Sequence, residues 1–149
     1  MRRKMVILLA DDDEDDRLLA RDALRESGES ADLRCVSDGK QLLDYLRAEG
    51  SFAAPDAAPR ADLILLDLNM PCLDGREALR QIKGDKKLRR TPVVILTTSR
   101  SHVDVWGSYD EGANSFISKP VSFEELIEVM RNLRHYWADT VQLPRSNEL

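Results

Sequence analysis

Acidic residues stand where two apolar runs of the sequence end. Six consecutive acids, residues 11–16, follow directly on Ile7–Ala10, and Asp67 follows a second apolar run. Carboxylates that share a crevice repel one another unless a cation binds or protons are taken up. Oxygen ligands of this kind select Mg²⁺ or Mn²⁺. Asp11, Asp12 and Asp67 are therefore candidate ligands of a divalent metal.

The later acids of the first group, residues 13–16, have a simpler interpretation. Acidic side chains are favourable in the first turn of a helix, where the peptide dipoles leave partial positive charge. We therefore expect residues 13–16 to form a solvated turn and helix start, outside the metal site.

The elements that would position the acids follow from hydrophobic periodicity. Short apolar runs typical of buried strands alternate with amphipathic segments of helical spacing. The expected strands are residues 5–10, 32–36, 62–66, 92–97 and 115–118, and the expected helices are residues 15–27, 39–49, 75–84, 102–111 and 122–137. This alternation predicts an α/β fold, a doubly wound five-stranded parallel sheet with helices on both faces.

The order of the strands decides where the acids lie. In the flavodoxin-like (βα)5 order 2-1-3-4-5, ligands bind beyond the carboxyl ends of strands one and three, where the order reverses. Asp11 and Asp12 follow the first expected strand and Asp67 follows the third. This order therefore predicts one crevice that holds all three carboxylates.

Composition narrows the classes of ligand. The formal net charge is −5, and the six consecutive acids contribute −6, so the rest of the chain is close to neutral. Nucleic acid is therefore disfavoured as the main ligand, because it requires a basic surface.

Cys35 and Cys72 are far apart and without ligand spacing, which favours neither a zinc site nor a disulfide. No apolar run is long enough to span a membrane and no signal peptide is evident, so we expect a cytoplasmic protein.

Three further motifs accompany the acid pair. The stretch that begins at Asp67 reads DLNMPCLDG, Thr97–Ser99 reads TTS, and Lys119 is followed by proline. With the acid pair they resemble the receiver domain of bacterial response regulators over about residues 4–137. The intervals of 30 residues from Asp67 to Thr97 and of 22 from Thr97 to Lys119 are those of the single-domain chemotaxis receivers. The longer interval before Asp67 is explained by the Ala- and Pro-rich segment Glu49–Ala61.

The resemblance implies a function in phosphoryl transfer. Asp67 would be the nucleophile that takes a phosphoryl group from a phosphohistidine on a sensor histidine kinase. Asp12, Asp67 and the backbone carbonyl of Asn69 would hold Mg²⁺, with Mn²⁺ as an alternative, and Asp11 would act through water. Positive charge is needed because the carboxylate and the phosphoryl group are both anionic. The protein would catalyse only its own phosphorylation and dephosphorylation.

Four more residues take their roles from the same resemblance. Lys119 would pair with the nucleophile or with a phosphoryl oxygen, and Thr97 would hydrogen-bond the phosphoryl group and draw the following loop inward. Phe116 stands at the position of the family's switch aromatic, often Tyr, but lacks the hydroxyl, so its motion would depend on packing alone. A fixed core Phe is the alternative. Ser99 would tune the lifetime of the phosphoryl group together with Asn69.

Some residues of the motifs have structural interpretations. Gly75 would permit a positive φ in its turn, and Asp74 would cap the helix that follows. The resemblance also implies a cis bond between Lys119 and Pro120, since X–Pro is the one peptide bond with a small cis penalty. We expect His102 and His135 to be surface residues, because neither has partners at ligand or triad spacing.

Finer features favour one group of receivers. The stretches LTTS (residues 96–99) and GANSFISKPVSFEEL (residues 112–126) look more like the small receivers that are paired with bacterial phytochrome kinases than like chemotaxis receivers. A chemotaxis-type receiver is the alternative. We expect a receiver domain, residues 1–138, followed by a short C-terminal tail, residues 139–149, without a DNA-binding output domain. The expected partner is a sensor histidine kinase of the phytochrome type.

Apolar residues near the end of the chain predict self-association. A large exposed apolar patch usually marks an interface, and a two-fold dimer buries such a patch against itself. We therefore expect a homodimer built on the fourth helix, fifth strand and fifth helix. The alternative is that the two tryptophans pack inward on their own sheet. The residues concerned are Val105, Trp106, Tyr109, Tyr136, Trp137, Val141 and Leu143.

Two other classes of protein share part of this pattern. Phosphatases of the haloacid dehalogenase type also use an Asp nucleophile with Mg²⁺, but they place a second acid two residues later as general acid. Asn69 stands at that position, which argues against such an enzyme. A purely structural interaction module is the third interpretation.

Overall fold

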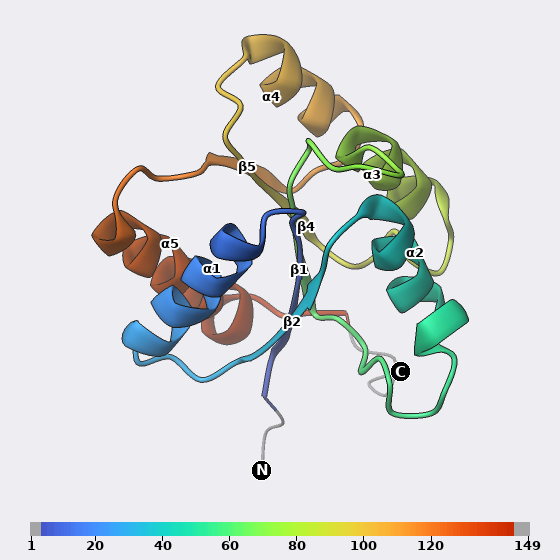
Figure 1. Ribbon diagram of the computed structural model, residues 1–149, viewed down its shortest axis with the longest axis horizontal. Helices are drawn as coiled ribbons and strands as arrows, with labels where there is room; N and C mark the ends of the chain where they lie inside the picture. Colours follow the sequence, from blue (N-terminus) through green and yellow to red (C-terminus); the bar gives the residue numbers. More distant parts are fainter. Residues whose placement is uncertain (1–3, 145–149) are drawn as a thin grey trace.

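A five-stranded parallel sheet forms the centre of the computed structural model, which describes residues 4–144 (Figure 1). The strand order is β2-β1-β3-β4-β5, which confirms the predicted flavodoxin-like arrangement. The strands are β1 (Val6–Ala10), β2 (Asp32–Val36), β3 (Leu63–Leu66), β4 (Val93–Thr97) and β5 (Ser115–Ser118). The helices are α1 (Glu14–Glu26), α2 (Gly39–Arg47), α3 (Gly75–Gly84), α4 (His102–Asp110) and α5 (Phe123–His135), with short turns η1 (Gly50–Phe52) and η2 (Tyr136–Thr140).

The helices cover the sheet in two layers. In Figure 1, α1 and α5 lie on one face and α2 and α3 on the other. Side chains alternate along a strand, so β1 sends Leu8 and Ala10 into the core beneath α2 and α3, and Ile7 and Leu9 into the core beneath α1 and α5. Burial on both faces explains why this strand is apolar throughout.

Side-chain caps fix where the helices begin. Asp13 accepts hydrogen bonds from the backbone N–H groups of Asp15 and Asp16, which starts α1 directly after the acid pair. Asp74 accepts from the N–H of Arg76, so its expected role as the cap of α3 is confirmed. These caps place both helix starts beside the carboxyl ends of β1 and β3, where the candidate ligands stand.

The end of the described chain folds back onto the sheet and its helices. Leu143 is buried in the core on the α1 and α5 side, and the carbonyl of Pro144 accepts a hydrogen bond of 3.3 Å from Arg60. Leu143 is therefore not part of an exposed patch, which corrects the expectation for this residue. Residues 145–149 of the expected tail lie outside the described residues.

Other sequence expectations concern the surface. His102 and His135 are exposed, as predicted. Within residues 4–144, the helices are all too short or too polar to cross a membrane.

Candidate functional site

The three candidate metal ligands meet at the carboxyl ends of β1 and β3. Asp11, Asp12 and Asp67 each offer a carboxylate oxygen, and these oxygens all lie within 4.8 Å of one another. Asp11 and Asp67 are buried, at 2% and 6% exposure, whereas Asp12 is exposed. The donor set consists of hard oxygen atoms and is open on the side of Asp12, which suits a divalent cation such as Mg²⁺ or Mn²⁺.

Burial makes the charge of this cluster costly. Burial raises the pKa of Asp11, although Lys119 and a hydrogen bond of 2.9 Å from the backbone N–H of Asp13 favour the charged carboxylate. Asp67 is held close by on the neighbouring strand end, where its N–H donates to the carbonyl of Ala10 at 3.0 Å. Additional positive charge between these carboxylates would relieve their mutual repulsion.

Lys119 supplies positive charge from the end of β5. Its Nζ lies 2.7 Å from Asp11 Oδ2, 2.8 Å from Asp16 Oδ2 and 3.3 Å from Asp67 Oδ2. Burial disfavours the charged ammonium, but the hydrogen bonds to Asp11 and Asp16 outweigh it and raise the pKa of Lys119 above its ordinary value. Lys119 therefore remains a cation at the edge of the carboxylate cluster.

The expected cis bond between Lys119 and Pro120 is wrong. Among residues 4–144 there is no cis peptide bond, so this bond is trans. The trans form is the favoured isomer even for X–Pro, by about 0.5–1 kcal/mol. The backbone N–H of Lys119 donates to the carbonyl of Thr97 at 2.7 Å.

Asp16 lies in the first turn of α1, as expected, but the expectation that it is solvated is wrong. The side chain of Asp16 is half-buried and bound to Lys119. Asp16 precedes the buried Ala20 by four residues, so both lie on the inward face of α1. That spacing is the signal in the sequence that could have identified it.

Thr97 lies on β4 and Phe116 on β5, and these two strands are neighbours in the sheet. Thr97 is fully buried, and its Oγ1 donates a hydrogen bond of 2.8 Å to Oδ1 of Asp67. Phe116 is half-buried and packs against the core on the α2 and α3 side. Its register partner in the sheet is Ile95, two residues before Thr97.

The loop between β3 and α3 depends on Gly75 for a reason other than the one expected. Gly75 does not have a positive φ; in this loop the left-handed residue is Cys72, with a φ of 66°. A side chain at Gly75 would instead overlap the carbonyl oxygen of Asp67 and come within 2.7 Å of Leu68 Cα. The start of α3 is thus packed directly on the backbone of Asp67.

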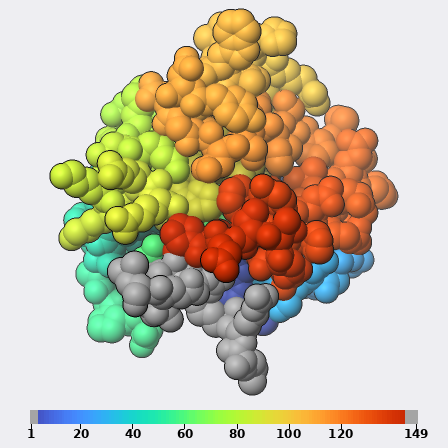
Figure 2. Space-filling view, turned by 180° about the vertical axis from the view of Figure 1, so that it is seen from behind, coloured from blue at the N-terminus to red at the C-terminus, as the bar shows by residue number. Residues whose placement is uncertain are grey.

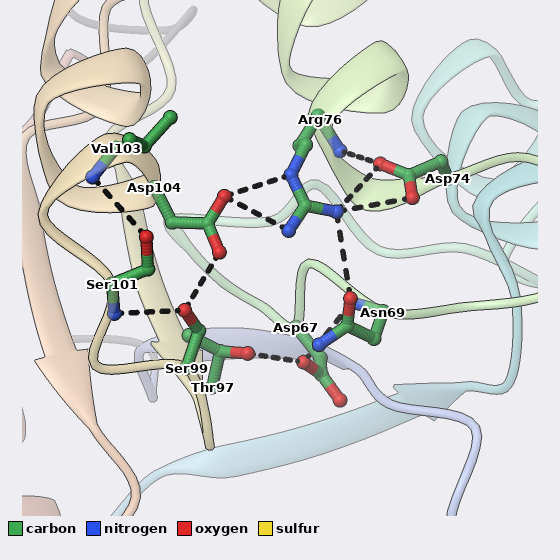
Figure 3. A network of polar contacts seen from close by, with 9 residues as sticks. All are labelled: Asp67, Asn69, Asp74, Arg76, Thr97, Ser99, Ser101, Val103 and Asp104. Carbon is green, nitrogen blue, oxygen red and sulfur yellow. Dashed lines mark hydrogen bonds and ion pairs between the residues drawn. The ribbon is translucent and has the colours of Figure 1, made fainter.

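A second network of polar side chains lies beside Asp67 and joins α3 to α4 (Figure 3). Arg76 donates from Nη2 and Nε to Oδ1 of Asp104, at 2.9 and 3.1 Å, and from Nη1 to Asp74 and Asn69. Asp104 also accepts a hydrogen bond of 2.6 Å from Ser99. No pattern in the sequence indicates a role for Arg76 or Asp104, because no motif links residues of two different helices.

A hollow opens beside the carboxylate cluster on the α1 and α5 side. Its volume is about 320 Å³, and its polar lining consists of Asp11, Asp16, Thr98, Arg100 and Lys119. Its apolar wall includes Leu19, which is 45% exposed, and Val121, which is 95% exposed. A side chain from another molecule could approach the cluster through this opening.

The sequence and the fold are similar to those of known proteins. The family model described as "Response regulator receiver domain" matches residues 7–131. The chain is similar to "Response regulator Rcp1" of Synechocystis sp., with 37% identity over 141 residues, 95% of this chain and 93% of that protein. A crystal structure of Rcp1 in a Mn²⁺-bound form matches with a TM-score of 0.84 and 37% identity, over 95% of this chain and 99% of that one.

Two further solved structures are similar over nearly the whole chain. The phosphorylated cyanobacterial phytochrome response regulator RcpA has a TM-score of 0.87 and 39% identity, over 96% of this chain and all of that one. Response regulator RPA3017, described in red light signalling of R. palustris, has a TM-score of 0.90 and 38% identity, over 95% of this chain and 99% of that one.

Proposed function

Because this chain belongs to the family of response regulator receiver domains, we propose that Asp67 is its phosphoacceptor and that a sensor histidine kinase is the donor. The observation that carries the proposal is the setting of Asp67. Its buried carboxylate has the Thr97 hydroxyl at 2.8 Å on one oxygen and the Lys119 ammonium at 3.3 Å on the other. Asp11 and Asp12 complete the acidic cluster beside it.

The residues present fit a divalent cation. Asp12, Asp67 and the backbone carbonyl of Asn69 would hold Mg²⁺ or Mn²⁺, and Asp11 would act through water. The Mn²⁺-bound form of Rcp1 supports this choice of ion. When bound, the cation supplies positive charge between the carboxylate and the incoming phosphoryl group.

Transfer to Asp67 makes one bond and breaks another. An oxygen of the Asp67 carboxylate attacks phosphorus, the P–N bond to the donor histidine breaks, and its electron pair stays on the imidazole. Lys119 is placed to bind a phosphoryl oxygen because its Nζ already borders Asp67. Such fixed positive charge stabilises the negative charge on the transferring group.

Phosphorylation would be reported through Thr97 and Phe116. The Thr97 hydroxyl now donates to Asp67 and would turn to a phosphoryl oxygen, drawing the loop after β4 inward. Phe116 has no hydroxyl to follow with a hydrogen bond, so its response would depend on the space that this movement opens. This switch would alter which surface the protein offers to a partner, or would precede transfer of the phosphoryl group to another protein.

The proposed donor is a phytochrome-type histidine kinase acting in the cytoplasm. Similarity to the phytochrome response regulator RcpA and to RPA3017 supports this pairing. The exposed Leu19 and Val121, at the rim of the hollow beside Lys119, would contact the kinase.

Intact mass spectrometry after incubation with acetyl phosphate and Mg²⁺ tests this function. We expect most molecules to gain one phosphoryl group, whereas an unchanged mass would refute phosphoacceptance. The same incubation separates a receiver from a phosphatase. A phosphatase would hydrolyse the donor through many turnovers, but Asn69 is an amide and cannot act as the general acid that such turnover needs.

We also propose a homodimer built on α4, β5 and α5. Figure 2 shows α4 projecting at the top of the molecule. Val103 and Trp106 on this helix are 80% and 71% exposed, so Trp106 does not pack inward, whereas Trp137 packs against the core. A large exposed apolar patch usually marks an interface, so these side chains support the proposed dimer.

We also propose that the receiver domain is residues 1–138, with residues 139–149 as its tail.

Light scattering tests the dimer. We expect a mass of two chains for the wild type and of one chain for Trp106→Ser. A wild-type mass of one chain, both before and after phosphorylation, would contradict the dimer.

A further inference from the structure

Two loops, which follow β3 and β4, are joined to each other by a bridge of four side chains. Asn69 belongs to the loop after β3, and its backbone N–H donates to Oδ1 of Asp67 at 3.3 Å. Ser99 belongs to the loop after β4 and lies two residues beyond Thr97. Between them stand Arg76 from the start of α3 and Asp104 from the first turn of α4, as Figure 3 shows. We call this set the Arg76–Asp104 bridge.

The contacts of the bridge form a continuous chain of hydrogen bonds from Asn69 to Ser99. Arg76 Nη1 donates to Oδ1 of Asn69 at 3.4 Å, and two other guanidinium nitrogens donate to Oδ1 of Asp104. The second oxygen of Asp104 accepts from Ser99 Oγ at 2.6 Å. Both oxygens of Asp104 and the polar oxygens of Asn69 and Ser99 are thus engaged by bridge partners.

The bridge is more than a surface ion pair. The Ser99 hydroxyl, together with the Arg76 guanidinium, holds the pKa of Asp104 below its usual range, although partial burial opposes this. The side chain of Asp104 is 19% exposed and that of Arg76 is 36% exposed. Ser99 is fixed further, since its Oγ accepts from the N–H of Ser101 and its carbonyl accepts from Ser118. The side chain of Ser99 is therefore held in one orientation.

We propose that Arg76 and Asp104 are positioning residues that lengthen the life of the phosphoryl group on Asp67. The inference rests on the proposed function, because it concerns the phosphorylated form of the same site. A phosphoryl group on Asp67 has to lie between the loops of Asn69 and Ser99. The bridge keeps the side chains of these two residues occupied and closed over that space.

Loss of the phosphoryl group requires water in that space. The oxygen of a water molecule attacks phosphorus, the P–O bond to Asp67 breaks, and its electron pair returns to the carboxylate. The products are the Asp67 carboxylate and dihydrogen phosphate, which keeps both protons of the water. An attacking water needs acceptors to hold it, and the free oxygens of Asn69 and Ser99 would serve. While these oxygens are engaged by Arg76 and Asp104, the water has fewer partners and less room.

Four variants test the inference in the full-length chain. Arg76→Gln and Asp104→Asn each break the bridge from one side, and the double variant combines the two substitutions. Arg80→Gln is the matched control. Arg80 also lies on α3 and pairs at 3.9 Å with Glu111, the residue that follows α4, but no hydrogen bond or ion pair within residues 4–144 joins it to the loops beside Asp67. Each protein is phosphorylated with acetyl phosphate and Mg²⁺, the donor is removed, and the remaining phosphoprotein is followed by intact mass spectrometry.

We expect each single bridge variant to lose its phosphoryl group about three- to tenfold faster than the wild type, the effect of one or two hydrogen bonds on a transition state. The double variant should match the single variants, because the two residues act as one unit. The rate of phosphoryl uptake should change less than about twofold, which separates positioning from general loss of structure. Arg80→Gln should behave as the wild type.

Several outcomes would overturn the inference. One is an unchanged lifetime of the phosphoryl group in the bridge variants, and a second is an equal effect in Arg80→Gln. A third is that the effects of Arg76→Gln and Asp104→Asn multiply in the double variant. A fourth is loss of phosphoryl uptake in either single variant. Failure of the wild type to take up phosphate would instead refute the function proposed for Asp67, so the two failures can be told apart.

Discussion

The hydroxyl of Thr97 donates a hydrogen bond of 2.8 Å to Oδ1 of Asp67, and both residues are buried. The contact joins the carboxyl ends of β4 and β3, which are neighbours in the sheet. It means that the residue proposed to report phosphorylation already contacts the proposed phosphoacceptor before any phosphoryl group is present.

Thr97→Val is expected to lower the free energy of unfolding by about 1.5–3 kcal/mol, since it removes a hydrogen bond to a buried charged group. Urea denaturation without metal measures this. The neighbouring Thr98 is exposed, so Thr98→Val is the control and should change stability by less than about 0.5 kcal/mol. Equal effects of the two variants would mean that the Thr97 contact contributes nothing specific.

Metal binding is expected to depend on Asp12. Asp12→Asn should weaken Mg²⁺ binding about tenfold or more, because it removes one of the three clustered carboxylates. Asp15→Asn makes the same charge change one turn away on an exposed residue and should weaken binding less than about twofold. Calorimetric titration compares the two, and similar losses of affinity would place the ion elsewhere.

Lys119→Met should destabilise the metal-free protein by about 3 kcal/mol, because it leaves buried carboxylates without their cation. Mg²⁺ should restore part of this loss, since a bound ion stabilises the folded state and supplies positive charge to the same cluster. Denaturation with EDTA and with Mg²⁺ measures both effects. Lys40→Met serves as control, because Lys40 is exposed and its pair with Asp44 contributes little. A loss of stability in Lys119→Met that Mg²⁺ leaves unchanged would separate Lys119 from the metal cluster.

Gly75→Ala is expected to reduce both stability and phosphorylation. The new Cβ would meet the backbone of Asp67 and Leu68, which has to move, at a cost of about 1–3 kcal/mol. Gly84→Ala is the control on the same helix, because nothing lies within 4 Å of its added Cβ, and this variant should be neutral or slightly stabilising. Wild-type behaviour of Gly75→Ala in both assays would show that the close approach is not needed.

Much of the fold and the centre of the site could be predicted from the sequence. Apolar runs of strand length define a sheet buried on both faces, and a known strand order brings the ends of β1 and β3 together. Asp11, Asp12 and Asp67 follow those ends directly, so a prediction of strand order is also a prediction of their position.

Contacts between helices could not be predicted in the same way. The pair of Arg76 with Asp104 depends on how α3 and α4 are turned toward each other, which no local pattern encodes. Asp16 was misplaced because the preference of acids for a helix start says nothing about which face of the helix they occupy. The role of Gly75 was misread because a turn glycine suggests positive φ, whereas the packing of α3 on Asp67 is a tertiary feature.

The most direct test of the central claim is the intact mass of Asp67→Asn beside the wild type, after incubation with acetyl phosphate and Mg²⁺. Asn has no carboxylate to attack phosphorus but has nearly the same shape, so circular dichroism should show an unchanged fold. We predict that the wild type gains one phosphoryl group and that Asp67→Asn gains none. Stoichiometric phosphorylation of a folded Asp67→Asn protein would contradict the account.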